Sequence, residues 1–271
     1  MSEASGWQPP EVDLETPNAA RIYDYSLGGT HNFPADRAAA EELFRIYPDA
    51  RLVGRSNRAF LRRAVRYCID QGIRQFLDLG SGIPTVGNVH EIAHQVDPEI
   101  RVVYVDNEPV AVALTQHLLK EVPNATVVQA DIRDVDAVLG APQTQLLDFT
   151  QPIALMMVAV LHYVSYEEDA PGLVARYTSK LAPGSFLVIS HTTGDDQPEA
   201  EEIRQLFAKT STPVTHRTRA EVTALFDGLE LVEPGVVWTP EWHPDDSDPL
   251  REDPKRSATY AGVARKRAAH S

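Results

Sequence analysis

Apolar and polar positions along the chain follow two different periods, and the period changes near residue 75. Apolar residues recur at helical spacing over 34–46 and 55–71, after a short helix-like run at 19–25 that a glycine pair ends. From Gln75 onward, short β-rich runs alternate with helical patterns, which is typical of βαβ units with a parallel sheet. We therefore expect N-terminal helices followed by an α/β domain.

The alternating region contains candidate strands with candidate helices between them. The expected strands are Gln75–Leu79, Arg101–Asp106, Thr126–Gln129, Ile153–Val160 and Ser185–Ser190. The expected helices lie near 86–96, 109–121, 166–181 and 198–209. Capping-box spacing predicts two helix starts, at Ser165–Glu168 and Thr218–Glu221.

The C-terminal region follows a different pattern. Leu229–Trp238 and Thr259–Ala264 are both strand-like, and a loop rich in Pro and Asp, 239–257, joins them without a helix. Two strands joined in this way should be antiparallel. The chain is therefore expected to form a doubly wound α/β sheet of seven strands. We expect residues 1–71 to be an arm and helical cap, and residues 72–271 to be the core.

Charge and composition narrow the classes of function. The chain has 271 residues, of which 43% are hydrophobic, so it can bury a substantial core. Its 39 acidic and 25 basic side chains give a formal net charge of −14, which repels DNA, RNA and anionic membranes. No stretch reaches the roughly 18 apolar residues of a membrane span, and the N-terminus lacks the layout of a signal peptide. We expect a cytoplasmic protein with neither nucleic acid nor membrane as its partner.

Few side chains suggest redox or metal chemistry. The one cysteine, Cys68, lies in an apolar helical pattern, which favours a core position over a catalytic thiol and excludes an internal disulfide framework. No group of His, Cys and Asp has recognisable metal-ligand spacing. We therefore expect no metal site.

The strongest chemical signal lies where the first predicted strand ends. Asp78 is followed by Gly80 and Gly82, and glycines permit a tight turn and the close approach of a ligand to the backbone. Asp106 ends the second strand, at a spacing that suits a carboxylate accepting hydrogen bonds from ribose. Asp131 follows the third strand. Because parallel strands end at one edge of a sheet, these three acids predict a nucleoside site.

These residues resemble a known class. The order Asp78-x-Gly80-x-Gly82, then Asp106 and Asp131, resembles class I S-adenosylmethionine-dependent methyltransferases over about residues 72–267. Segments 20–29, 57–61, 87–91 and 160–162 are similar to a narrower family described simply as S-adenosyl methyltransferase. The resemblance implies a Rossmann-like sheet whose antiparallel pair forms the sixth and seventh strands. It also implies S-adenosyl-L-methionine as the cofactor and methyl transfer as the activity. The net charge and the lack of nucleic-acid features lead us to expect oxygen or nitrogen of a small molecule as the acceptor.

The resemblance also implies which residues bind the cofactor. Asp78 and the backbone of Gly80 and Gly82 would face its methionine part. Asp106 would hold the ribose. The adenine would be contacted by Asn107, Asp131 and Ile132.

The acceptor side has weaker signals. The fourth strand ends at His162, which can be a base or can orient an acceptor; a satisfied structural histidine is the alternative. His191, after the fifth strand, is a second candidate. Trp242 and His243 are expected over the same edge, where aromatic side chains can form an acceptor wall or anchor a loop.

The N-terminal segment holds aromatic residues around a Gly-Gly pair. Tyr23 and Tyr25 precede it, and aromatic faces gain cation–π energy near a sulfonium, which predicts a lid over the cofactor. A helix pair that only covers the sheet is the alternative. In the next helix, arginines recur on one face, which favours a solvated surface paired with acids over a phosphate-binding patch: Arg51, Arg55, Arg58, Arg62 and Arg66.

Two other functions fit part of the pattern. An NAD-dependent oxidoreductase also binds a nucleoside at strand ends, but Pro84 stands where its fingerprint has a third glycine. A non-catalytic sensor or scaffold could keep the nucleoside pocket, since the acceptor side has no diagnostic motif. The sequence leaves the acceptor and the oligomeric state open.

Overall fold

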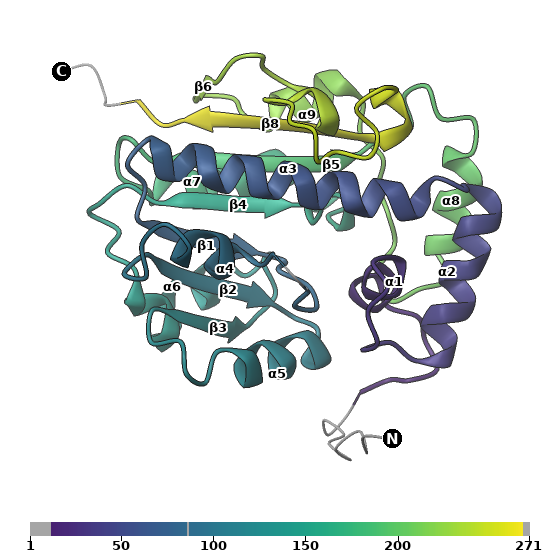
Figure 1. Ribbon diagram of the computed structural model, residues 1–271, viewed down its shortest axis with the longest axis horizontal. Helices are drawn as coiled ribbons and strands as arrows, with labels where there is room; N and C mark the ends of the chain where they lie inside the picture. The colour runs from purple at the N-terminus through teal and green to yellow at the C-terminus, as the bar shows by residue number, and fades with distance from the viewer. Residues whose placement is uncertain (1–11, 86, 268–271) are drawn as a thin grey trace.

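Eight strands form one mixed sheet in the computed structural model, which describes residues 12–85 and 87–267 (Figure 1). Their spatial order is β3-β2-β1-β4-β5-β8-β6, and β7 pairs with β8. The order reverses between β1 and β4, because the chain first builds outward to β3 and then returns to the other side of β1. The sheet is therefore doubly wound, as the alternating pattern predicted.

The first five strands are parallel to their neighbours. Near-continuous apolar runs form them, because helices cover both faces of the sheet. Their bounds match the predicted strands closely, and those of the first two match in full: β1 (Gln75–Leu79), β2 (Arg101–Asp106), β3 (Ala125–Gln129), β4 (Ala154–Val158) and β5 (Phe186–Thr192).

The C-terminal strands are antiparallel, as predicted, but they number three among the described residues. β8 (Thr259–Arg265) pairs with β5, β6 (Glu230–Leu231) and β7 (Val237–Trp238). The single strand expected over Leu229–Trp238 is thus wrong. Pro234 has no N–H to donate, and Gly235 (φ +87°) closes a turn onto the carbonyl of Val232. The sheet consequently has eight strands where seven were expected.

Helices flank both faces of the sheet. One apolar core lies between the sheet and α3, α4 and α5, and a second lies between the sheet and α6, α7 and α9. Cys68, on α3, is fully buried in the first core, as predicted. The helices are α1 (Ala19–Ser26), α2 (Pro34–Ile46), α3 (Ala50–Asp70), α4 (Val89–His94), α5 (Pro109–Leu118), α6 (Val135–Gly140), α7 (Ala170–Ser179), α8 (Ala200–Phe207) and α9 (Arg219–Ala224).

One predicted helix start is correct and the other is four residues early. Thr218 and Glu221 cap α9 reciprocally, as their spacing predicted. Ser165 N–H does donate to the Glu168 carboxylate at 2.7 Å, yet α7 begins only at Ala170. Asp169 has a left-handed conformation (φ 51°), which breaks the helical path and makes it the N-cap of α7.

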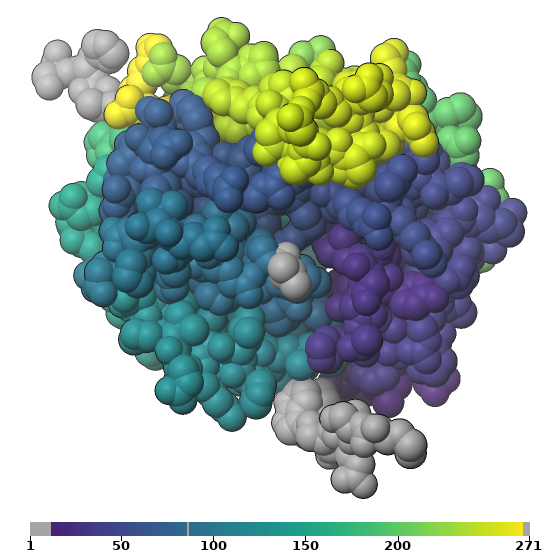
Figure 2. All heavy atoms as spheres, in the orientation of Figure 1, coloured from purple at the N-terminus to yellow at the C-terminus, as the bar shows by residue number. Residues whose placement is uncertain are grey.

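A helical cap stands at the carboxyl ends of the parallel strands. Figure 1 shows the arrowheads of β4 and β5 pointing towards α1, α2 and α8. These three helices share a small apolar cluster of their own, which includes Ile22, Ala40, Phe207 and Val214. α8 packs with the cap, and α3 contacts both the cap helices and the sheet. In Figure 2 the purple surface of α1 and α2 meets the blue-to-teal surface of the core along a seam.

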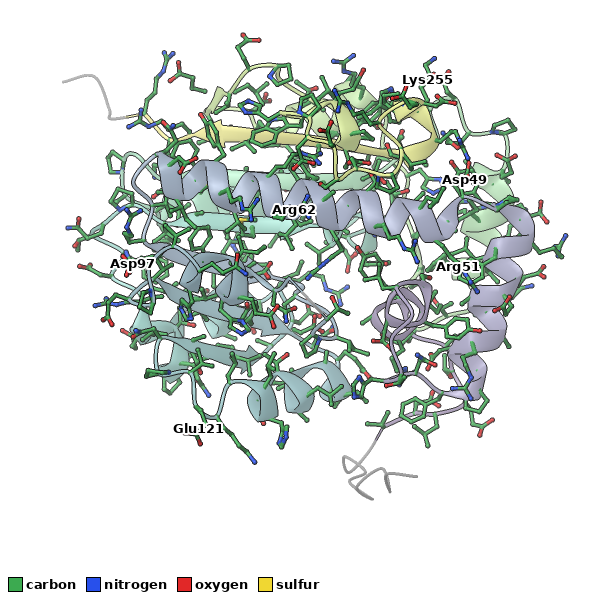
Figure 3. The ribbon with its side chains drawn as sticks, viewed as in Figure 1. Asp49, Arg51, Arg62, Asp97, Glu121 and Lys255 are labelled. Atoms are coloured by element: carbon green, nitrogen blue, oxygen red, sulfur yellow. The ribbon has the colours of Figure 1, made fainter. Side chains whose placement is uncertain are left out.

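The arginine face of α3 is partly a solvated surface. Arg51 pairs with Glu41, and Arg62 pairs with Asp245, as expected of exposed charges (Figure 3). Arg58 differs, because it donates to the Gly87 carbonyl at 2.7 Å and lines a cavity.

Candidate functional site

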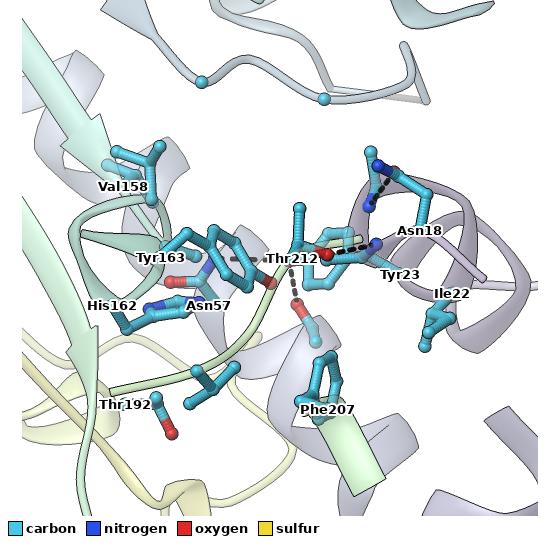
Figure 4. Close-up of a pocket in the computed structure, with 18 of the residues that line it drawn as sticks. Asn18, Ile22, Tyr23, Asn57, Val158, His162, Tyr163, Thr192, Phe207 and Thr212 are labelled. Carbon is cyan, nitrogen blue, oxygen red and sulfur yellow. Dashed lines mark hydrogen bonds between the residues drawn. The ribbon is translucent and has the colours of Figure 1, made fainter. Parts of the chain in front are cut away.

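A cavity of about 350 Å³ lies at the carboxyl ends of the parallel strands, bordered by α1, α2, α3 and α8 (Figure 4). It spans the point between β1 and β4 where the strand order reverses. Open α/β sheets bind ligands at this point, and the volume falls within the range of ligand pockets. The fold therefore places the candidate site where the sequence predicted it.

The turn after β1 brings its backbone close to the end of β4. Gly80 (φ +70°) faces Val160, and a Cβ added there would stand 2.2 Å from the Val160 Cγ2 atom. Gly82 (φ +67°) donates its N–H to the Asp106 carboxylate at 2.7 Å. Glycine is thus required at Gly80 for both space and conformation, and the turn is fixed directly to the acid at the end of β2.

Asp106 is buried and oriented by backbone donors. One carboxylate oxygen accepts from Gly82 N–H and the other accepts from Glu108 N–H at 2.9 Å. Burial raises the pKa of Asp106, although these N–H groups oppose the shift. Each oxygen keeps a second lone pair, so Asp106 can still accept hydrogen bonds from a ligand in the cavity.

Asp78 is a buried carboxyl that faces one nearby cation. Burial raises its pKa to about 7, Arg58 opposes this shift, and Asp106 adds to it. A carboxyl with such a pKa gains much from a cationic ligand, because a second positive charge would stabilise its ionised form.

The third acid occupies a more open place. Asp131 lines the cavity and accepts from Arg133 at both oxygens, with a shortest distance of 2.6 Å. These hydrogen bonds lower the pKa of Asp131, so it is ionised. Ile132 and Asn107 line the same end of the cavity.

Only one of the two predicted lid tyrosines reaches the cavity. The Tyr23 hydroxyl donates to the Gly54 carbonyl at 3.0 Å, and its side chain lines the cavity. Tyr25 lies on the outer side of the cap, where its hydroxyl donates to Glu41 at 2.7 Å and its ring stacks on Phe44. The helical period explains the difference, since residues two positions apart point to different sides of α1.

His162 lines the cavity from a 3₁₀ turn, Leu161–Tyr163, just after β4. The chain enters this turn through Ala159, whose φ of 57° is strained for a residue with a Cβ. The Nδ1 atom of His162 is buried without a hydrogen-bond partner among the described residues. Burial lowers the pKa of His162 well below its usual value, so the ring is neutral. His162 therefore has a ring nitrogen that no described residue bonds, and its role on the acceptor side stays a prediction.

His191 is fixed inside the protein and does not line the cavity. Its Nδ1 bonds the Thr192 carbonyl at 2.7 Å, and Arg217 donates to its Nε2 at 2.9 Å. Burial lowers the pKa of His191 to about 3. With both ring nitrogens bonded, His191 supports the turn that carries His162, because Arg217 also donates to the Leu161 carbonyl.

The loop after β7 also lies away from the cavity, contrary to its expected place over the strand ends. Trp242 is fully buried against Phe60 and Tyr67 of α3, and His243 stacks on Trp242. The buried Trp242 ring anchors the loop, because it packs against the aromatic side chains of α3.

Sequence reasoning missed several residues that line the cavity. Asn57 is buried beneath it, donates to the Tyr23 hydroxyl at 3.2 Å and accepts from Ser190 at 2.6 Å. Arg58 and Tyr163 also line it. The motifs Asn57–Leu61 and Val160–His162 already stood out in the sequence, and these contacts explain their polar members.

Among the described residues, no group of three or more His, Cys, Asp or Glu side chains could hold a metal ion. Nor is any helix in that part of the chain long and apolar enough to cross a membrane.

S-adenosylmethionine fits the donor set of this cavity. Carboxylates suit ribose hydroxyls and an adenine amino group, and the carboxyl of Asp78 suits a cationic ligand. At Gly82 nothing lies within 4 Å of the position a Cβ would take, so the backbone there is open to a ligand beside these acids. The doubly wound sheet, the glycine turn and the acids at consecutive strand ends define a nucleoside-binding α/β protein of the class I methyltransferase type.

The comparison with known families gives the particular assignment. A profile of the family described as S-adenosyl methyltransferase matches residues 5–267, so the chain belongs to this family. It is an S-adenosylmethionine-dependent methyltransferase, and S-adenosyl-L-methionine is its cofactor. This assignment displaces the oxidoreductase and the non-catalytic alternatives.

Two solved structures are similar over nearly the whole chain. A DUF574 family protein from Streptomyces avermitilis is 43% identical, covers 94% of this chain and 99% of its own, and has a TM-score of 0.90. A candidate methyltransferase from Thermobifida fusca is 40% identical, covers 97% and 100%, and also has a TM-score of 0.90.

A more distant structure shares the fold. The 1,6-didemethyltoxoflavin-N1-methyltransferase of Burkholderia thailandensis is 18% identical, covers 86% of this chain and 89% of its own, and has a TM-score of 0.50. No curated protein matches the chain.

Proposed function

We propose that the enzyme transfers the methyl group of S-adenosylmethionine to an oxygen or nitrogen of a small molecule bound on the β4–β5 side of the cavity. One observation carries the proposal: a single cavity joins the acidic ends of β1, β2 and β3 to His162 and Tyr163 after β4. A cofactor on the first side and an acceptor on the second would meet inside one cavity. The net charge of −14 favours a small neutral or cationic acceptor over a nucleic acid.

The residues at the ends of β1, β2 and β3 bind different parts of the cofactor. Asp106 holds the ribose hydroxyls, because its oxygens are already oriented by backbone N–H groups. Tyr23 presents an aromatic face from the cap, where it can stabilise a sulfonium. Asp78, Gly80 and Gly82 face the methionine part, and Asn107, Asp131 and Ile132 surround the adenine.

The chain's own residues mainly align the reactants. The cofactor supplies a methyl group on a positively charged sulfur, and the protein has to place the acceptor in line with it and exclude water. His162 is neutral and borders the cavity, so it can accept a hydrogen bond from the acceptor's O–H or N–H. Because its pKa is lowered, His162 mainly orients the acceptor, and removal of the acceptor's proton is a smaller part of its role.

The direct test has two stages. Isothermal titration calorimetry with S-adenosylhomocysteine measures cofactor-site binding, and transfer of a radiolabelled methyl group to a metabolite library then measures catalysis. Binding followed by transfer to a small molecule supports the proposal. Binding without transfer to any library member or cell extract fraction contradicts it.

Asp106→Asn is expected to weaken S-adenosylhomocysteine binding by about 1–3 kcal/mol, since a charged hydrogen-bond acceptor for ribose is lost. Calorimetry on the folded variant measures the change. Asp97→Asn is the matched control, because Asp97 lies at the opposite edge of the sheet (Figure 3). Unchanged affinity in Asp106→Asn would remove this residue from the cofactor site.

Cofactor binding is expected to weaken as the pH falls through 7. Asp78 has a pKa of about 7 in the free protein, and a cationic cofactor binds best when Asp78 is ionised. From pH 8 to pH 6, this protonation should reduce the affinity for S-adenosylmethionine about tenfold. In the Asp78→Asn variant, the part of the pH dependence that comes from Asp78 should be absent. The pH dependence that remains in the variant then comes from titration of the cofactor itself. Identical pH profiles for wild type and variant would contradict the role of Asp78.

A further inference from the structure

The walls of the cavity differ sharply in charge. Within residues 12–85 and 87–267, the walls contributed by α1, α2, α8, residues 211–214 and the ends of β4 and β5 contain no Asp, Glu, Lys or Arg. An ionised acceptor there would lose its hydration without gaining a counter-ion, which is costly. All the charged lining residues belong to α3 or to the β1–β3 edge: Arg58, Asp78, Asp106, Glu108, Asp131 and Arg133.

Several polar groups of these uncharged walls are already bonded within the protein. The Tyr23 hydroxyl donates to the Gly54 carbonyl and accepts from Asn57 at 3.2 Å. The Thr212 hydroxyl accepts from Ala19 N–H at 2.9 Å (Figure 4). The remaining surface is mostly apolar, so it suits an apolar ligand. Its apolar side chains include Ile22, Leu43, Ile203, Phe207 and Val214.

Tyr163 and His162 supply free polar groups at the end of β4. The Tyr163 side chain extends into the cavity (Figure 4), and its hydroxyl has no hydrogen-bond partner in the described part of the chain. Its ring lies against the His162 ring, with 4.2 Å between the centroids. Burial raises the pKa of Tyr163 and lowers that of His162, so both side chains are neutral. Together they offer an O–H donor and a nitrogen acceptor, which match the two hydrogen-bonding capacities of a hydroxyl group.

We infer that the methyl acceptor is an uncharged, largely apolar molecule whose hydroxyl group is held by Tyr163 and His162, an inference that rests on the proposed methyl transfer. The acceptor oxygen forms a bond to the methyl carbon while the carbon–sulfur bond breaks, and the electron pair stays on sulfur as a neutral thioether. The hydroxyl proton passes to the neutral ring of His162 and then to solvent. An alkylamine is disfavoured, because it is cationic near neutral pH and these walls offer no carboxylate.

The inferred class of acceptor, an uncharged hydroxyl compound, is tested with molecules that share a scaffold and differ only in carrying a hydroxyl, carboxylate or amine group. The wild-type enzyme is supplied with S-adenosyl-[methyl-³H]methionine and with 2-naphthol, 2-naphthoate or 2-(aminomethyl)naphthalene, and with the same three groups on phenyl, cyclohexyl and octyl scaffolds. We expect methyl transfer to hydroxyl members to exceed transfer to charged members at least about tenfold. Faster transfer to carboxylates or amines overturns the inference but leaves the proposed function standing. Transfer to no member of any class overturns both.

The Tyr163→Phe variant tests the residue. It should lower kcat/KM for the best hydroxyl acceptor about tenfold, because one hydrogen bond to that acceptor is lost. Its affinity for S-adenosylhomocysteine should stay within about twofold, since the cofactor lies along other strands. Tyr25→Phe is the matched control, because the Tyr25 hydroxyl bonds Glu41 outside the cavity. An unchanged kcat/KM, or an equal loss of S-adenosylhomocysteine affinity, overturns the assignment of Tyr163 to the acceptor.

Discussion

Arg21→Met is expected to lower the free energy of unfolding by about 3–5 kcal/mol, the cost of leaving buried carboxylates without their cation. Arg21 is buried on α1, 3.1 Å from the Asp36 carboxylate and 3.3 Å from that of Glu108. Its remaining guanidinium nitrogen donates to the Thr16 carbonyl at 2.8 Å. Methionine keeps much of the side-chain volume, so the loss would come from charge and hydrogen bonding.

Urea denaturation measures the change, and Arg45→Met is the control. Arg45 pairs with Glu42 and Glu202, but all three side chains are exposed, so this variant should unfold almost like the wild type. Similar unfolding midpoints for the Arg21 and Arg45 variants would show that the buried ion pairs contribute little. Burial raises the pKa of Glu108 and Arg21 opposes this, so Glu108 should take up a proton more readily in the variant.

His162→Ala is expected to reduce kcat about a hundredfold with an acceptor found by the library screen, the lower end of the range for a proton-accepting residue. The loss should be this moderate because the ring's lowered pKa makes it a weak base. S-adenosylhomocysteine affinity should change little, since His162 follows β4 and the cofactor residues follow β1, β2 and β3.

The control and the pH dependence separate a role in the reaction from a role in folding. His243→Ala removes a histidine that stacks on Trp242 outside the cavity, and its turnover should match the wild type. The ratio of wild-type to His162→Ala activity should stay constant from pH 8 to pH 6, because a histidine with a lowered pKa remains neutral there. A ratio that falls with pH would mean that the ring is protonated in this range. Equal turnover by His162→Ala would assign His162 to structure.

The sequence pattern was enough to predict those strands and helices in which one periodicity of apolar residues determines the secondary structure. The runs that form β1 and β2 are mostly apolar, and an acid stands beside the last residue of β1 and at the last residue of β2, so both the strands and the positions of Asp78 and Asp106 could be predicted. The start of α7 could not, because the left-handed conformation of Asp169 overrides the capping spacing before it.

Side-chain direction limited the prediction of the site. Arg58 follows the same spacing as its exposed neighbours on α3, yet only the packing of α3 against the sheet turns it towards Asp78. Tyr23 and Tyr25 looked equivalent in the sequence, and the rotation of α1 separates them. Tyr163 carried no signal beyond its place beside His162, because a free hydroxyl is recognised only when its surroundings are known.

The ion pair between Arg21 and Glu108 has a consequence for turnover. Arg21 belongs to the cap, whereas Glu108 lies two residues after Asp106 at the edge of the cofactor site. If the cap has to open for the spent cofactor to be exchanged, this pair must separate and its charges must be rehydrated. Such a step would slow dissociation of S-adenosylhomocysteine more than it changes the chemistry. The residence time of the product would then be a property of α1, far along the chain from the strands that recognise it.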